Sequence, residues 1–144
     1  MAVLYNVDKS KYVELKLFSS DEPEWIAYTM SGGEMYNKKH IELFRLDNDE
    51  LFFHNSYDEE VSDLMKGLRD IKKSDHYRFT PKDEGEFILK AIYKDNRICI
   101  NISFYIIDKV VKDELQDNEF EIVTTYSNLS DFLTQLGEEY AGIK

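Results

Sequence analysis

The 144-residue sequence has one cysteine, two prolines and six glycines. A lone cysteine, Cys99, cannot form an internal disulfide, which favours a reducing compartment. So little proline and glycine argues against a disordered chain. No run of about 18 apolar residues is present, so no membrane span is predicted. The N-terminus lacks the basic flank and apolar core of a signal peptide, and we therefore expect a cytoplasmic protein.

Basic residues are also scarce. The chain has 18 lysines and arginines against 29 aspartates and glutamates, a formal charge of −11. Such a surface repels phosphate backbones and anionic lipids, so neither nucleic acid nor membrane is an expected partner. The simplest explanation of the charge is solubility. The alternative is a basic protein partner that the charge would steer toward the surface.

Three consecutive strands are predicted over residues 86–93, 98–107 and 120–125. In the middle one, Ile98, Ile100, Ile102, Phe104 and Ile106 alternate with more polar positions, which is typical of a strand with one buried face. Residues 94–96 (Lys-Asp-Asn) form a short polar turn that predicts a hairpin.

Further strands are predicted on both sides of this group. They cover residues 3–7, 12–18, 24–30 and 76–79, with a hairpin of strands 39–46 and 50–54 joined at 47–49. Residues 31–33 (Ser-Gly-Gly) are expected to end the strand before them, and residues 34–38 are expected to form a surface loop.

Two helices are predicted. Over residues 57–73, Val61, Leu64, Met65, Leu68 and Ile71 make one apolar face, and Ser56 and Glu59 have the spacing of a capping box. Gly67 within this helix suggests close packing on the sheet. A C-terminal helix over residues 128–141, capped by Ser127 or Asn128, has its own apolar face.

These elements predict an α+β fold in a single domain over residues 1–144. One antiparallel sheet of about six to eight strands would be covered by the two helices, because no strand–helix–strand alternation is present.

The sequence contains no recognisable catalytic, cofactor or metal motif. His40, His54 and His76 lie in separate segments without a second ligand at metal spacing, and Cys99 inside a strand is expected to be a structural thiol. No phosphate-binding loop and no serine nucleophile motif is present. We therefore predict a protein that is not an enzyme, with no catalytic residue, no cofactor and no metal.

Aromatic residues are plentiful, at 14% of the chain. Tyrosine and tryptophan are enriched in protein interfaces, so an acidic and aromatic binding face is one interpretation; filling of the core is the other. Three clusters are candidate contacts for a partner. They are Asp47, Asp49 and Glu50 in a predicted turn, Tyr57, Asp58 and Glu59 at a predicted helix start, and Asp113, Glu114 and Asp117 in a predicted loop.

The order of elements in the C-terminal part resembles that of WapI-type immunity proteins. The resemblance covers about residues 57–142 and lies in residues 77–81, 86–90, 98–107, 120–123 and 129–133. It implies a small cytoplasmic bacterial protein that binds and neutralises a cognate toxin domain, for example a basic nuclease. Its motifs are strand patterns, so it implies no site residues.

Two other functions are compatible with the sequence. One is a domain that binds a small ligand in a pocket between sheet and helices, lined by rings such as Trp25 and Tyr105. The other is a mimic of nucleic acid, whose carboxylates would be spaced like phosphates on one face. The oligomeric state and the identity of a toxin stay open.

Overall fold

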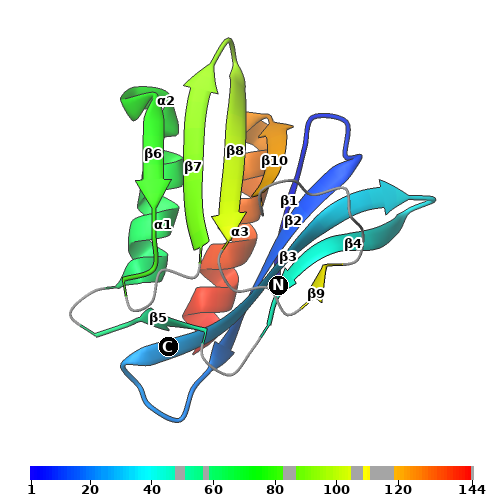
Figure 1. Cartoon of the computed structure of the whole chain (residues 1–144). Coiled ribbons are helices and arrows are strands. Elements are labelled where there is room, and N and C mark those ends of the chain that lie inside the picture. Colours follow the sequence, from blue (N-terminus) through cyan, green and yellow to red (C-terminus); the bar gives the residue numbers. More distant parts are fainter. Residues whose placement is uncertain (48–50, 57–58, 83–86, 105–108, 111–118, 144) are drawn as a thin grey trace.

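The computed structural model describes residues 1–47, 51–56, 59–82, 87–104, 109–110 and 119–143. They form an α+β fold with two antiparallel sheets, of six and four strands (Figure 1). The α+β class is therefore confirmed, whereas the prediction of one continuous sheet is wrong. Two separate sheets allow aromatic rings from both to meet in one interior, as described below.

The first sheet has the strand order β1-β2-β3-β4-β9, and β5 pairs with β3. Its strands are β1 (Ala2–Tyr5), β2 (Lys11–Ser19), β3 (Trp25–Tyr36), β4 (Lys39–Leu46), β5 (Phe52–His54) and β9 (Lys109–Val110). In β2, Val13, Leu15 and Leu17 are buried in the core as their alternation predicts.

Strand β3 runs through the two glycines that were expected to end it. A Cβ atom on Gly33 would lie 1.9 Å from the carbonyl oxygen of Ile41, and one on Gly32 would lie 2.4 Å from the ring of Phe44. A bulge between the two glycines shifts the pairing with β4. The glycines therefore allow β4 to approach closely, and residues 34–36 belong to the strand instead of a loop.

Strands β4 and β5 do not form the predicted hairpin. Both pair antiparallel with β3, β4 along Met30–Tyr36 and β5 along Trp25–Ala27. They therefore follow one another along the same edge of β3. Asp47, which directly follows β4, and Phe52 of β5 therefore lie beside the same strand.

The second sheet has the order β10-β8-β7-β6 and confirms the three predicted consecutive strands. Its strands are β6 (His76–Phe79), β7 (Phe87–Lys94), β8 (Arg97–Phe104) and β10 (Glu119–Thr124). Asp95 and Asn96, with φ angles of 53° and 62°, form the predicted two-residue turn between β7 and β8. The end of the predicted long strand, residues 105–107, lies outside the described residues.

The mid-chain helix is shorter than predicted and is interrupted. Helix α1 (Glu60–Arg69) is followed after Asp70 by the one-turn helix α2 (Ile71–Ser74). Its N-cap residue is Glu59, so Ser56 does not cap it, and residues 57–58 lie outside the described part. Instead, the buried carboxylate of Glu60 accepts hydrogen bonds from the backbone N–H groups of His54 and Lys82.

Close packing at Gly67 is confirmed. A Cβ atom there would lie 2.1 Å from the ring of Tyr77, which is on β6. The Tyr77 hydroxyl donates a hydrogen bond to the carbonyl oxygen of Asp63, so the ring is held against the helix.

Helix α3 (Tyr126–Ile143) begins two residues before the predicted start. The hydroxyl oxygen of Thr125 accepts from the backbone N–H of Asn128, which makes Thr125 the cap in place of Ser127 or Asn128. The Asn128 side chain instead donates to the carbonyl oxygens of Tyr5 and Asn6, and so ties the helix to the end of β1.

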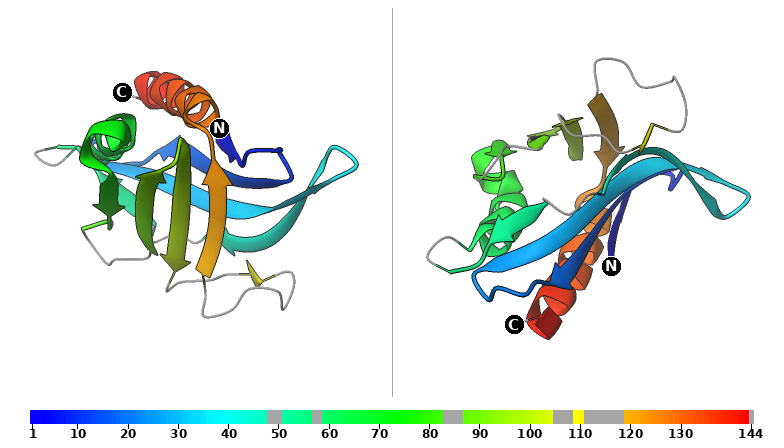
Figure 2. Two further views of the ribbon diagram at one scale, coloured as in Figure 1. Left: turned by 90° about the horizontal axis from the view of Figure 1, so that it is seen from above. Right: turned by 60° about the horizontal axis from the view of Figure 1, so that its bottom comes forward.

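One cluster of buried side chains joins both sheets and the helices. Aromatic rings bridge the sheets, with Phe44 stacked on Phe104 at 4.7 Å and Tyr28 in edge contact with Phe87 at 5.9 Å between ring centroids. Helices α1 and α3 contact each other, and α3 also packs on β1 and β2 (Figure 2). The first sheet therefore keeps an outer face that is turned away from this interior.

Candidate binding site on the outer face of the first sheet

The strand register places a small side chain between two large ones on the outer face of the first sheet. Ala27 on β3 is paired with Phe18 on β2 and with Phe52 on β5. Directly paired residues in antiparallel strands point to the same face, so the methyl group of Ala27 lies at the bottom of a hollow between two phenyl rings.

Trp25 extends this apolar floor. Its ring centroid lies 6.0 Å from that of Phe52 and 4.2 Å from that of His54. On the other side, Phe18 is 39% exposed although it is a large apolar residue, and the Lys16 ammonium lies 5.1 Å from its ring centroid. The floor therefore combines several aromatic rings that are only partly covered.

The connection between β2 and β3 supplies an acidic rim. The Ser20 hydroxyl shares its one proton between the carbonyl oxygens of Glu22 and Trp25, and the Trp25 N–H donates to the carbonyl oxygen of Glu22. These hydrogen bonds fix the conformation of the turn that carries Asp21 and Glu22. Both carboxylates are exposed at the edge of the aromatic floor.

Asp47 lies at the opposite end of the site. Its carboxylate accepts a hydrogen bond of 2.8 Å from Arg45, which also donates to Glu42 at 2.7 Å. These two hydrogen bonds raise the pKa of Arg45, so the guanidinium stays charged at any physiological pH. Asp47 thus contributes an acidic group whose charge is partly balanced, whereas no described residue forms an ion pair with Asp21 or Glu22.

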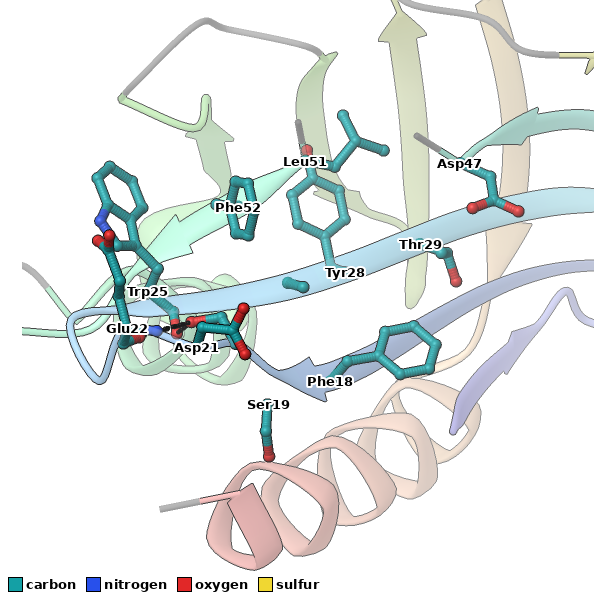
Figure 3. Close-up of a pocket in the computed structure, with 12 residues that line it drawn as sticks. Phe18, Ser19, Asp21, Glu22, Trp25, Tyr28, Thr29, Asp47, Leu51 and Phe52 are labelled. Carbon is teal, nitrogen blue, oxygen red and sulfur yellow. Dashed lines mark hydrogen bonds between the residues drawn. The ribbon is translucent and has the colours of Figure 1, made fainter. Parts of the chain in front are cut away.

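Together these residues enclose a cavity of about 670 Å³ (Figure 3). We refer to it as the Trp25 cavity. Among the residues that the structure describes, twelve line it, with three carboxylates and no lysine, arginine or histidine. They are Phe18, Ser19, Ser20, Asp21, Glu22, Trp25, Ala27, Tyr28, Thr29, Asp47, Leu51 and Phe52.

Of the nine predicted contact residues, the structure describes two. Asp47 lines the Trp25 cavity, and Glu59 is exposed at the start of α1. Asp49, Glu50, Tyr57, Asp58, Asp113, Glu114 and Asp117 lie outside the described residues, so their contribution to binding stays a prediction. Trp25, expected in a pocket between sheet and helices, instead lines a cavity on the outer face, and Tyr105 is not among the residues described.

The histidines and the cysteine occupy separate environments. The His40 ring stacks on Tyr12 at 4.1 Å, His54 lies on Trp25, and His76 is exposed on β6. Within the described ranges, no group of three or more His, Cys, Asp or Glu side chains could hold a metal ion. Burial, with the nearby Glu121 carboxylate, raises the pKa of Cys99, so the neutral thiol is favoured over the reactive thiolate.

Comparison with known proteins gives no match. No family model matches the chain, and neither a curated protein nor a solved structure is significantly similar to it. In the described part of the chain, no helix is long and apolar enough to cross a membrane. The functional interpretation therefore depends on the geometry of the site itself.

Sequence reasoning did not find Phe18, Ala27, Phe52, Asp21 or Glu22. Asp21 and Glu22 lie in the segment between the predicted strands 12–18 and 24–30, but nothing in the sequence places that segment beside Phe52. The only available signal was the alternation of β2, which predicts Phe18 on the outer side and so an apolar ring facing solvent.

Proposed function

We propose that this protein is a non-enzymatic binding protein that receives a basic side chain of a protein partner in the Trp25 cavity. The observation that carries the proposal is the composition of the cavity: an aromatic floor and three carboxylates, with no cationic side chain among the described residues that line it. A lysine or arginine from a partner would place its charge near the carboxylates and its aliphatic stem on the rings.

Two further properties support a basic partner. The net charge of −11 would steer a basic protein toward this surface and raise the association rate at low salt. In addition, the hydrogen bonds of Ser20 hold the turn that carries Asp21 and Glu22 before any partner arrives. Less ordering on binding means that less conformational entropy is lost.

The resemblance of residues 57–142 to WapI-type immunity proteins suggests the class of partner. In this proposal, the partner is the toxic domain of a bacterial toxin, and binding neutralises it in the cytoplasm. A nuclease is the leading example, because its active-site cleft is built to attract phosphate and is therefore basic. The acidic rim of the cavity would compete with the nucleic acid substrate for the basic residues of that cleft.

The experiment begins with capture of a partner from the source lysate at low salt, followed by its identification and purification. Binding is then measured by calorimetry for the parent and for Ala27→Leu, which fills the hollow between Phe18 and Phe52. Ala27→Ser is the matched control, since it changes the same position but keeps the hollow. We expect Ala27→Leu to weaken binding at least tenfold and Ala27→Ser to leave it within about twofold.

A second pair of variants tests the charges. Asp21→Lys with Glu22→Lys reverses the rim, and Asp63→Lys with Asp131→Lys makes the same change in net charge on exposed positions of α1 and α3. The rim variant should lose about 2 kcal/mol of binding free energy, or about 30-fold in affinity. Equal losses for both variants would show that only the net charge matters, and the proposed site would be wrong.

A small organic cation is a second candidate for the same cavity. The volume of about 670 Å³ lies within the range of roughly 300–1,000 Å³ that is typical of small-molecule sites. Native mass spectrometry of the protein purified from its source distinguishes the two functions. A bound small cation that is absent from Ala27→Leu would favour ligand binding; an unliganded protein that captures a basic protein would favour the first proposal.

A further inference from the structure

Among the described residues, no helix packs on one face of the second sheet. In Figure 1, α1 and α3 both lie behind this sheet, and the buried residues of its strands belong to the same core cluster as the buried residues of both helices. The side chains that alternate with these buried residues point to the opposite face. On that face are His76 and Arg78 of β6, Ile88, Lys90 and Ile92 of β7, Cys99, Asn101 and Ser103 of β8, and Glu119, Glu121 and Val123 of β10.

An apolar row crosses this face. The register aligns Val123, Cys99 and Ile92 on three neighbouring strands, and the exposed His76 of β6 ends the row. Ile92 is 55% exposed and Val123 is 43% exposed. Val7, which is 42% exposed, lies beside Val123, because its N–H donates to the carbonyl oxygen of Val123. Contiguous exposed aliphatic side chains of this kind are typical of contact surfaces.

A charged row runs beside the apolar row, and its charge changes sign across the sheet. The register aligns Glu121 on β10 with Asn101, Lys90 and then Arg78 on β6. Glu119 adds a second acid at the β10 edge. Within the part of the chain that the structure describes, none of these acids forms an ion pair with Lys90 or Arg78. One edge of the face is therefore acidic and the other basic.

We propose that this face is the contact surface of a symmetric dimer of the chain. In a face-to-face pair, a twofold axis parallel to the strands keeps the order of the rows and reverses the order of the strands. Glu121 of one copy then lies over Arg78 of the second copy, and in the neighbouring row Cys99 lies over Ile92 and Val123 over His76. An axis perpendicular to the strands would place Glu121 over Glu121, so the charges select the first arrangement.

The size of the face predicts a weak dimer. The four strands have 4, 8, 8 and 6 residues; at about 4.8 Å between strands and about 3.3 Å per residue they give a footprint of roughly 400 Å² on each copy. About 800 Å² in total is below the size of stable specific interfaces, so a transient contact is expected. The charge of −11 on each copy also opposes association over long distances.

The second copy is the occupant that the charge pattern favours, because the face is complementary to itself. An exclusively basic partner would meet Lys90 and Arg78, and an exclusively acidic one would meet Glu119 and Glu121. The face is also distinct from the Trp25 cavity, which lies on the first sheet. Self-association and binding of a basic partner are therefore separable.

The test is sedimentation velocity of the parent and of two variants at protein concentrations from about 10 µM to 1 mM and about 0.15 M salt, where charges further apart than roughly 8 Å are screened. Glu119→Lys with Glu121→Lys makes the face wholly basic. Arg78→Glu with Lys90→Glu makes it wholly acidic. Circular dichroism checks that each variant is folded.

We expect the parent to dimerise with a midpoint within this range and each variant alone to stay monomeric. An equimolar mixture of the two variants should form a heterodimer, because a basic face then meets an acidic one. Asp63→Lys with Asp131→Lys, on the helices, should dimerise like the parent. A parent that stays monomeric at 1 mM, variants that dimerise alone, or a mixture that stays monomeric would each overturn the proposal.

Discussion

Removal of the Glu60 carboxylate should destabilise the protein far more than removal of its neighbour. The Glu60 side chain is 2% exposed. One carboxylate oxygen accepts from the N–H of His54 at 3.2 Å, and the other accepts from the N–H of Lys82 at 3.3 Å. Through these hydrogen bonds, the start of α1 holds β5 of the first sheet and the segment that follows β6 of the second.

The magnitude follows from the number and geometry of these hydrogen bonds. Hydrogen bonds to a charged group contribute about 1.5–3 kcal/mol each, and distances of 3.2 and 3.3 Å favour the lower value. Glu60→Ala leaves two backbone donors without this acceptor, so we expect a loss of about 3 kcal/mol in the free energy of unfolding. Glu60→Gln keeps the shape and one acceptor oxygen, and should lose about half as much.

Urea denaturation followed by circular dichroism measures both values, provided that the slope of free energy against urea is unchanged. Glu59→Ala is the control, because Glu59 is exposed and provides no side-chain cap. It should change stability by less than about 0.5 kcal/mol. The reasoning would be refuted if Glu60→Ala were as stable as Glu59→Ala.

Three further predictions follow from the fold. Gly67→Ala should destabilise the protein by about 1–2 kcal/mol despite the better helix propensity of alanine, because Tyr77 occupies the space; an increase in urea midpoint would contradict this packing. Thr125→Ala should cost about 1 kcal/mol through loss of the cap of α3, whereas Thr125→Ser should be nearly neutral in thermal unfolding. Burial raises the pKa of Tyr12 and of Tyr77 from 10.0 to about 12. A folded-state pKa above the unfolded value means that stability is maintained below about pH 10 and lost as the pH rises toward 12. Tyr12→Phe should therefore flatten this alkaline loss in urea titrations, and an unchanged pH dependence would contradict the assignment.

The spacing of apolar residues predicted those strands and helices that bury one face and expose the other. The alternation of Ile98, Ile100, Ile102 and Phe104 gave the central strand of the second sheet, and all four side chains are buried. The apolar face of α3 was found for the same reason. The turn at Asp95 and Asn96 could be predicted because these residue types tolerate the left-handed backbone conformation of a two-residue hairpin turn, and both adopt it.

The sequence could not show contacts between distant segments. Gly32 and Gly33 were expected to end a strand. They are glycines because Phe44 and Ile41 approach them closely, and this contact exists only once β4 has paired with β3. The start of α1 was misjudged because Glu60 forms its hydrogen bonds with strand and loop residues outside the helix.

The Trp25 cavity illustrates the same limit for function. Its hollow exists because β2 and β5 both pair with β3 at Ala27, and this depends on a register that no local pattern specifies. Asp47 was chosen from the sequence as an exposed acid in a hairpin turn. The structure places it in the cavity for a different reason, since β4, which it follows, and β5 both pair with the same side of β3.

The most direct test of the central claim is the affinity of the purified partner for Ala27→Leu relative to Ala27→Ser. The proposal predicts that the partner is basic, that its affinity for the parent falls as salt is raised, and that Ala27→Leu alone weakens binding at least tenfold. Equal affinities for the two variants would contradict the account, because binding would then not depend on the hollow between Phe18 and Phe52.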